Sequence, residues 1–136
     1  MRWSELAVKI ESALRATGYV NSVYEGDVYD IWNNKEVPYV SACFDETALE
    51  PDSESLDTYS VMVFVADRLT EGNSNSRQAR DFARAVLKVT VATLRQQPPI
   101  GVTCGVLTPF VQKFADNLAG YYTTLTITIP SDIQNC

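Results

Sequence analysis

The residues of this chain best suited to chemistry are its carboxylates. Acidic pairs occur at Asp27 with Asp30 and at Asp45 with Glu46. Catalysis by two carboxylates requires both groups to face one substrate in surroundings that separate their pKa values. These acids belong to a polar, acidic stretch, which favours a solvated surface over an acid–base pair. An oxygen-ligand metal site within residues 45–55 is a second interpretation, but that stretch lacks the spacing and central glycine of an EF-hand loop.

Other reactive groups are scarce. Histidine is absent, which removes the usual general base and the usual nitrogen metal ligand. The three cysteines, Cys43, Cys104 and Cys136, have no CxxC spacing, which favours two buried thiols and one terminal residue over zinc or a disulfide framework. The sequence has no Walker loop, no dinucleotide-binding glycine pattern and no activated serine. We therefore expect no enzyme activity, no cofactor and no metal.

Charge is unevenly distributed along the chain. The formal net charge of −6 argues against non-specific nucleic-acid binding by the chain as a whole. The stretch from residue 25 to residue 57 nevertheless contains Lys35 as its one base, against ten acids: Glu25, Asp27, Asp30, Glu36, Asp45, Glu46, Glu50, Asp52, Glu54 and Asp57. From residue 68 to residue 116 the balance reverses, with seven bases: Arg68, Arg77, Arg80, Arg84, Lys88, Arg95 and Lys113.

Five of these bases form a stripe on a predicted helix. Arg77, Arg80, Arg84, Lys88 and Arg95 fall within an arc of about 80°, which we expect opposite the apolar stripe of the same helix. A solvated helix surface is one interpretation. A head-to-tail contact with the acidic part of another copy is a second, and such a contact can close into a ring. Neutralisation of DNA phosphates is a third. The candidate interface or lumen residues are this stripe together with Asp27, Asp30, Glu50, Asp52 and Glu54.

Two helices can carry and position these groups. Trp3, Leu6, Ile10 and Leu14 recur at helical spacing, and Gly18 follows where a helix C-terminal glycine would. A longer helix is predicted from Ser76 to Gln97. Its apolar stripe consists of Ala79, Phe82, Ala83, Val86, Leu87, Thr90 and Leu94. Asn75 and Gln78 have the form of a capping box. The preceding GNSNS loop is a possible anion site, although simple capping explains it better.

Strand patterns occupy the rest of the chain. Residues 19–34 predict one bent strand, or a strand and a loop with a turn at Asn33 and Asn34. Residues 37–44 predict a strand, and the acidic residues 45–55 an exposed loop or hairpin tip. Residues 58–67 are apolar on both faces, which predicts a central strand covered by helices on one side and by a strand layer or another subunit on the other. A kinked strand over 102–114 and an alternating one over 121–129 complete the pattern.

These elements predict one domain over residues 1–136. The order of helix, strands, helix and strands is typical of an α+β fold, with a mainly antiparallel sheet of about four to five strands flanked by two helices. The sequence has no apolar stretch of membrane-spanning length. Its first residues lack the apolar core of a signal peptide, so we expect folding in a cytoplasm.

Three segments carry a resemblance to a known family. They are VYEGDVYDIWN (Val23–Asn33), ADRLTEGNSN (Ala66–Asn75) and TPFVQKFADNLAGYYTTLTI (Thr108–Ile127). With these segments the chain resembles the tail-completion proteins of tailed bacteriophages, also called tail-terminator or neck-ring proteins, and is most similar to those of crAss-like phages. The resemblance implies an antiparallel sheet flanked by two helices. The family has no catalytic residues to transfer to this sequence.

The resemblance also implies a place of action. Such proteins form homo-oligomeric rings in the virion, at the head–tail neck or in the tail, and are assembled in the host cytoplasm. Their partners are other neck and tail proteins, on the portal or connector side and on the tail side. DNA passes through the lumen without sequence-specific binding, and no membrane is involved. The competing interpretation is a small non-catalytic adaptor or regulatory domain that acts as a monomer or dimer.

Overall fold

The computed structural model of the chain describes residues 1–34, 36–51, 55–70, 72, 74–98, 100–113 and 117–130. Three helices and six strands lie within these residues. Their order is α1 (Trp3–Ala16), β1 (Ser22–Glu25), α2 (Val28–Asn34), β2 (Ser41–Pro51), β3 (Leu56–Arg68), α3 (Ser76–Arg95), β4 (Gly101–Cys104), β5 (Thr108–Lys113) and β6 (Leu118–Pro130). The α+β class predicted from the sequence is confirmed.

The strands form a single mixed sheet in the order β1-β2-β3-β6-β4, and β5 also pairs with β6. Only the β1–β2 pair is parallel among the described pairs. The sheet is therefore larger than predicted and has three helices around it instead of two. The expected kinked strand over 102–114 is two strands, because β4 pairs with one half of β6 and β5 with the other.

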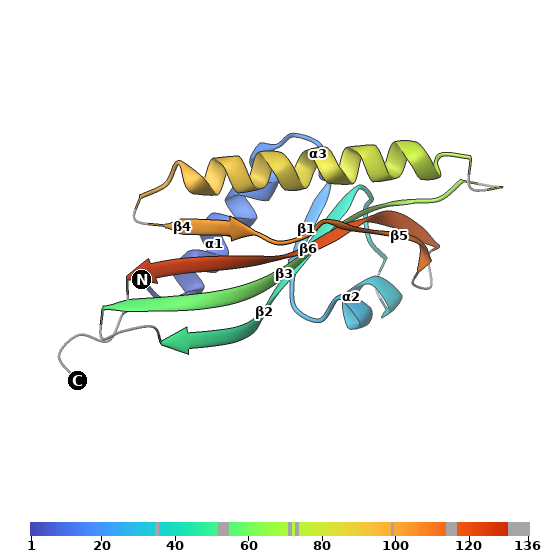
Figure 1. Cartoon of the computed structure of the whole chain (residues 1–136). Helices are drawn as coiled ribbons and strands as arrows, with labels where there is room; N and C mark the ends of the chain where they lie inside the picture. Colours follow the sequence, from blue (N-terminus) through green and yellow to red (C-terminus); the bar gives the residue numbers. More distant parts are fainter. Residues whose placement is uncertain are drawn as a thin grey trace.

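Helices α1 and α3 cover one face of the sheet, and α2 lies on the other (Figure 1). The side chains of β3 and β6 alternate between the two faces of the sheet, because every second side chain of a strand points to the same face. Those that point toward α1 and α3 belong to the larger hydrophobic core. Val61 and Val63 of β3 and Leu125 and Ile127 of β6 are buried against the helices. On the helix side, the buried residues of this core include Leu6, Ile10, Leu14, Ala83, Val86, Leu87 and Leu94.

The central position predicted for β3 is confirmed, since β3 pairs with β2 on one side and β6 on the other. Its second face is covered in part by α2, where the sequence left open a strand layer or another subunit. Trp32 of α2 is fully buried there, with its ring centroid 6.2 Å from that of Phe64. This second cluster consists of Val28, Ile31, Trp32, Val37, Cys43, Ala66, Phe110 and Leu118.

The prediction for residues 19–34 was wrong in its second half. After the short strand β1, the chain forms α2 and not a loop or a continued strand. Val28, Ile31 and Trp32 are buried together, which is the i, i+3, i+4 spacing of one helix face. Asp27 precedes this helix, and its Oδ1 accepts a hydrogen bond from the backbone N–H of Tyr29 at 2.8 Å. Such capping satisfies a backbone donor that the helix leaves without a partner.

The prediction of an exposed loop or hairpin tip over residues 45–55 was wrong for residues 45–51, because β2 continues as a strand to Pro51. It stays paired with β3 as far as the register Pro51↔Asp57, with an irregularity between Glu46 and Ala48. The acidic composition suggested a loop, but pairing with a long neighbouring strand decides the conformation here. Asp52 and Glu54 lie outside the described residues.

Two further predictions concern the ends of helices. Gly18 does end α1, with a φ of +79° that glycine adopts without a steric penalty. The capping box at Asn75 is wrong, since Asn75 makes no side-chain bond to the start of α3. Its amide group closes the preceding loop instead. Asn75 Oδ1 accepts from Thr70 N at 2.8 Å, and its Nδ2 donates to Arg68 O at 2.9 Å.

Gly120 is required by the close approach of β6 to β3. A Cβ at this position would overlap the backbone oxygen of Val65 and lie 2.9 Å from the Cα of Ala66. Neither backbone group can move away without breaking the pairing of the two long strands. The register that brings Tyr122 opposite Phe64 therefore depends on this glycine.

Candidate functional site

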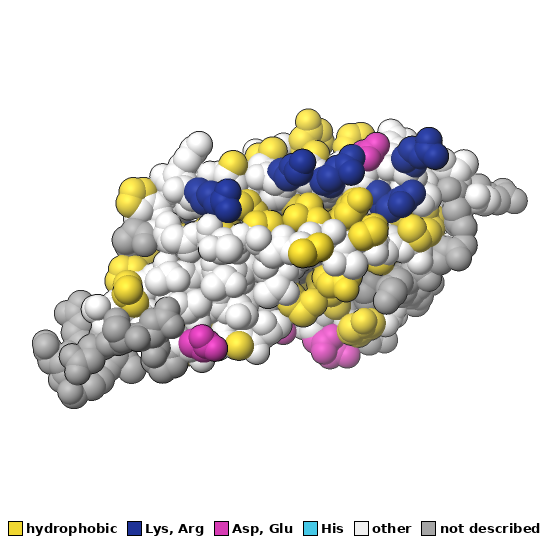
Figure 2. All heavy atoms as spheres, in the orientation of Figure 1, with side chains coloured by type: hydrophobic (Ala, Val, Ile, Leu, Met, Phe, Trp, Pro, Cys, Tyr) yellow, Lys and Arg dark blue, Asp and Glu magenta, His cyan; other side chains and the backbone are white. Residues whose placement is uncertain are grey.

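The five bases of the predicted stripe form a row along α3, which we call the basic row (Arg77, Arg80, Arg84, Lys88 and Arg95). All are exposed except Arg80, which is half-buried. Figure 2 shows the row above a strip of apolar side chains. The sequence predicts the row opposite the apolar stripe of the helix. In the structure the row lies beside the buried stripe instead. The Arg84 guanidinium is 5.9 Å from the centroid of the Tyr121 ring, and Arg95 Nε donates to Val102 O at 3.1 Å.

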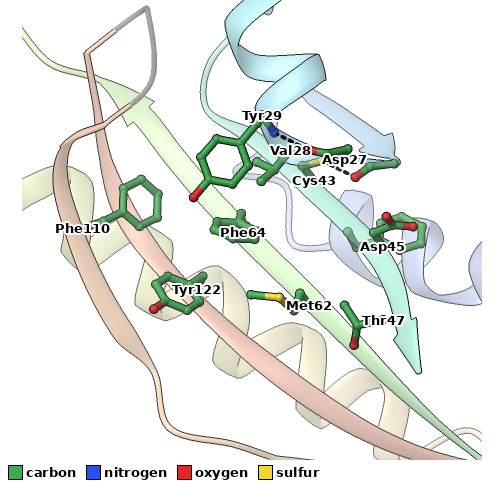
Figure 3. A pocket seen from close by; sticks show the side chains of 12 residues that line it. Asp27, Val28, Tyr29, Cys43, Asp45, Thr47, Met62, Phe64, Phe110 and Tyr122 are labelled. Carbon is green, nitrogen blue, oxygen red and sulfur yellow. Dashed lines mark hydrogen bonds between the residues drawn. The ribbon is translucent and has the colours of Figure 1, made fainter. Parts of the chain in front are cut away.

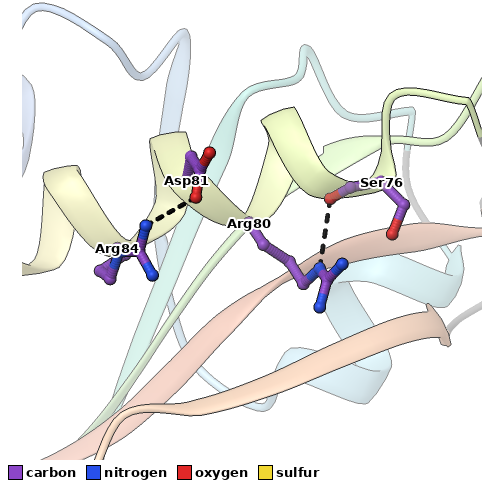
Figure 4. A network of polar contacts seen from close by, with 4 residues as sticks. All are labelled: Ser76, Arg80, Asp81 and Arg84. Atoms are coloured by element: carbon purple, nitrogen blue, oxygen red, sulfur yellow. Dashed lines mark hydrogen bonds and ion pairs between the residues drawn. The ribbon is translucent and has the colours of Figure 1, made fainter.

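These contacts turn the basic row toward the edge of the sheet that carries β4 and β5. Long arginine stems lie along apolar surface while the charged group stays in water, which explains their lean toward the sheet. Arg84 also pairs with Asp81 at 2.6 Å, and Arg80 Nε donates to Ser76 O at 3.4 Å (Figure 4). Exposed pairs three residues apart on a helix contribute only about 0.3–0.5 kcal/mol. The row as a whole remains strongly positive.

The described acids of the candidate site lie toward the other edge of the sheet. Asp27 and Asp30 are exposed at the start of α2, and Glu50 is exposed near the end of β2. Asp45 and Glu46 lie between them along β2. The backbone bond from Gly26 N to Phe44 O, 3.0 Å long, holds the start of α2 beside β2. From Phe44, Glu50 is about 20 Å further along the strand at the usual rise per residue.

The acidic edge and the basic edge lie at the same height along the strand direction. The register runs from Ala48 of β2 to Ser60 of β3, on to Thr126 of β6, and then to Thr103 of β4. At this level β2 and β4 are the outer strands of the sheet, and they run antiparallel to each other. In Figure 2, most of the visible acids lie at the lower rim, away from the basic row. The molecule is therefore acidic along one lateral edge and basic along the other.

A pocket beside α2 was missed by the sequence reasoning. It has a volume of about 300 Å³ and opens on the face of the sheet opposite α1 and α3 (Figure 3). Its walls include Asp27, Val28, Tyr29, Cys43, Asp45, Thr47, Met62, Phe64, Phe110 and Tyr122. The sequence offered one signal. Met62, Phe64 and Tyr122 are apolar or aromatic residues on the strand faces that point away from the helices.

Aromatic rings form one wall of this pocket. The rings of Phe64 and Tyr122 stack with centroids 5.0 Å apart, and Phe110 lies 6.2 Å from Phe64. Asp45 and Asp27 line the pocket on the sides of β2 and α2. Carboxylates beside aromatic faces attract cations and repel anions, because both present negative charge density. The pocket therefore has the chemistry of a cation site.

No protein-family model matches this chain, and a comparison with curated proteins also gives no match.

The thiol of Cys43 lies at the floor of the pocket and is fully buried. Burial raises its pKa from 9.0 to about 12, and the charges of Asp45 and then Asp27 add to this rise. Such a thiol stays protonated at neutral pH and is a poor nucleophile. Its Sγ donates to Gly26 O at 3.4 Å. Cys104 is half-buried, and Cys136 lies outside the described residues.

The described part of the chain contains no group of three Asp, Glu or Cys side chains placed to hold a metal ion. In the same residues, no helix has the length and apolar character needed to cross a membrane. At the start of α3, a shallow depression is bordered by Ser74, Ser76, Arg77 and Arg80. The anion site suggested by the GNSNS loop falls here and stays a prediction.

Proposed function

We propose that this chain is a virion structural protein that forms a homo-oligomeric ring at the head–tail neck or in the tail of a bacteriophage. One observation carries the proposal: the two lateral edges of the sheet bear opposite charge. A ring built from identical copies needs two different, complementary surfaces on each copy. The acidic β2 edge and the basic row above β4 and β5 are such a pair.

The strand directions agree with this arrangement. Rotation of one copy about an axis roughly parallel to the strands brings its β2 beside β4 of the next copy. Because β2 and β4 run in opposite directions, the two edges lie antiparallel at the same level. We propose that these edges overlap, so that the basic row of one copy faces the open side of the next sheet. Charge on such edges steers association and fixes the register between copies. We propose that other neck and tail proteins bind above and below the ring and that DNA passes through its lumen.

The proposal is tested by sedimentation velocity of the purified chain. The double variant Arg80→Glu/Arg84→Glu should assemble at about tenfold higher concentration or more, since two attractive charges become repulsive. The matched control is Lys9→Glu/Arg15→Glu on α1, which makes the same change of charge away from the row. The control should assemble as the wild type does, and both variants should keep the circular dichroism of the wild type.

Two results would contradict the proposal. Equal weakening by both variants would mean that net charge matters and the edges do not. A wild-type chain that stays monomeric at every concentration, with or without phage neck components, would instead match the adaptor interpretation.

A further inference from the structure

The pocket beside α2 combines two features that together recognise a particular chemical group. Its aromatic wall is built from Phe64, Tyr122 and Phe110, and its rim bears Asp27 and Asp45. A guanidinium group is planar, so it stacks on aromatic rings, and its parallel N–H groups pair with a carboxylate. An ammonium group gains the charge attraction but not the flat stacking.

The acids at the rim are held in place by the fold. The hydrogen bond from Tyr29 N fixes the carboxylate of Asp27 through its Oδ1. The backbone of Asp45 is held in β2, opposite Met62 of β3, and its side chain lines the pocket. Both carboxylates act on the same point inside the pocket, because each raises the pKa of the Cys43 thiol after the larger effect of burial. The interior of the pocket therefore lies close to two negative charges.

The basic row of the same molecule cannot fill this pocket. Helix α3 packs on the face of the sheet that carries the larger core, whereas the pocket opens on the opposite face. The sheet itself separates the two. A second copy faces no such barrier, and its basic row supplies four arginines of the right charge: Arg77, Arg80, Arg84 and Arg95.

We propose that the pocket receives the guanidinium group of an arginine from the basic row of a neighbouring copy. This inference rests on the proposed ring and names the contact that joins one subunit to the next. It places the acidic half of the contact at Asp27 and Asp45, with Phe64 and Tyr122 as the surface on which the guanidinium stacks. The remaining acids of β2 then attract the basic row of the neighbouring copy at longer range.

The first test removes the charge of the pocket and keeps its shape. In Asp27→Asn/Asp45→Asn, asparagine still caps α2, since it accepts the same backbone hydrogen bond. This variant should need about tenfold more protein to assemble, as expected for the loss of a partly buried charge contact. The matched control, Glu5→Gln/Glu11→Gln, removes two acids from α1 and should assemble normally.

A mixing experiment then identifies the partner of the pocket. The pocket variant keeps an intact basic row, and Arg80→Glu/Arg84→Glu keeps an intact pocket. Neither should self-associate at wild-type concentrations. An equimolar mixture should form heterodimers and stop there, because the surfaces left on each heterodimer are both defective. Native mass spectrometry distinguishes this result from two separate monomers, which would overturn the proposal.

A small probe tests the chemistry of the pocket directly. In a Trp3→Phe background, Trp32 is the one remaining tryptophan, and its ring lies 6.2 Å from Phe64 at the pocket wall. L-arginine amide should change its emission with a dissociation constant of about millimolar, the range of a few such contacts. Sodium chloride at equal ionic strength and lysine amide should act more weakly. Tyr122→Leu, which removes a stacking ring, should abolish the response.

The outcomes separate this inference from the proposed ring. If the pocket variant assembles as well as the wild type, the pocket contact is overturned and the ring stands. If the wild type never self-associates, the second copy is excluded as the source of the arginine, and both proposals fail. A missing response to L-arginine amide, with normal assembly of Tyr122→Leu, also overturns the pocket contact alone.

Discussion

Cys43 illustrates how the surroundings of one residue decide its chemistry. From the sequence it is one of three cysteines with no distinguishing spacing. In the fold it lies at the floor of an aromatic pocket, fully buried, with Asp45 and Asp27 nearby. Low solvent access and two negative charges both disfavour the thiolate. The thiol of the pocket beside α2 is therefore unreactive.

This perturbed thiol predicts a dependence of stability on pH. The pKa of Cys43 is raised in the folded state, so its contribution is fully present below pH 9.0 and is lost as pH rises toward 12. The free energy of unfolding should fall by about 1.4 kcal/mol per pH unit in that range. Urea denaturation at pH 8 and pH 10 should show this loss in the wild type and not in Cys43→Ser. Parallel loss in both proteins would contradict the assignment.

At the scale of elements, α2 and β2 show tertiary contacts overriding local composition. The segment that forms α2 is rich in aromatic and β-branched residues, which favour strands. It is a helix because Val28, Ile31 and Trp32 together cover one end of the sheet. The acidic residues of β2 are a strand because β3 offers hydrogen-bond partners along their whole length. Both elements form walls of the pocket.

The cap of α2 gives a prediction at this scale. Asp27→Ala removes the acceptor for Tyr29 N and should cost about 1 kcal/mol of stability. Asp27→Asn should cost little, because its side-chain oxygen can replace the carboxylate. Urea denaturation measures the difference, and hydrogen exchange of residues 31–34 should rise in the alanine variant first. Equal stability of the two variants would show that the cap does not stabilise α2.

At the scale of the whole molecule, the two lateral edges of the sheet carry opposite charge. The β2 edge bears acids, and the basic row covers the β4 and β5 edge. The open face between them is rich in hydroxyl groups, with Thr124 and Thr126 exposed and the Oγ1 atoms of Thr58 and Thr128 3.1 Å apart. None of these threonines carries charge, so the charge on this face comes from the β2 edge and from Asp27 and Asp45 at the pocket.

This arrangement predicts that salt weakens the proposed assembly. Raising sodium chloride from about 0.1 M to about 1 M shortens the screening length from about 10 Å to about 3 Å. The concentration needed for half-assembly should rise in the wild type, and the salt effect should shrink in Arg80→Glu/Arg84→Glu. Thr124→Val/Thr126→Val should respond as the wild type does. Assembly that strengthens with salt would indicate an apolar contact between copies.

The sequence by itself determined the elements whose side chains repeat with a clear period. The alternation of Val61, Val63 and Val65 predicts β3, and the stripe from Ala79 to Leu94 predicts α3. These patterns are local, because each strand or helix presents its own buried face. The α+β class, the central position of β3 and the segregation of acids from bases followed from such local signals.

Only the tertiary structure decided how these elements meet. The parallel pairing of β1 with β2, the extension of β2 and the turn of the basic row toward β4 all depend on partners distant in the chain. The pocket depends on them most, since Asp27 and Tyr122 line the same cavity only when β2, β3 and β6 pair in register. Strand pairing joins backbone groups without regard to sequence distance, so no short pattern of residues could have predicted this site.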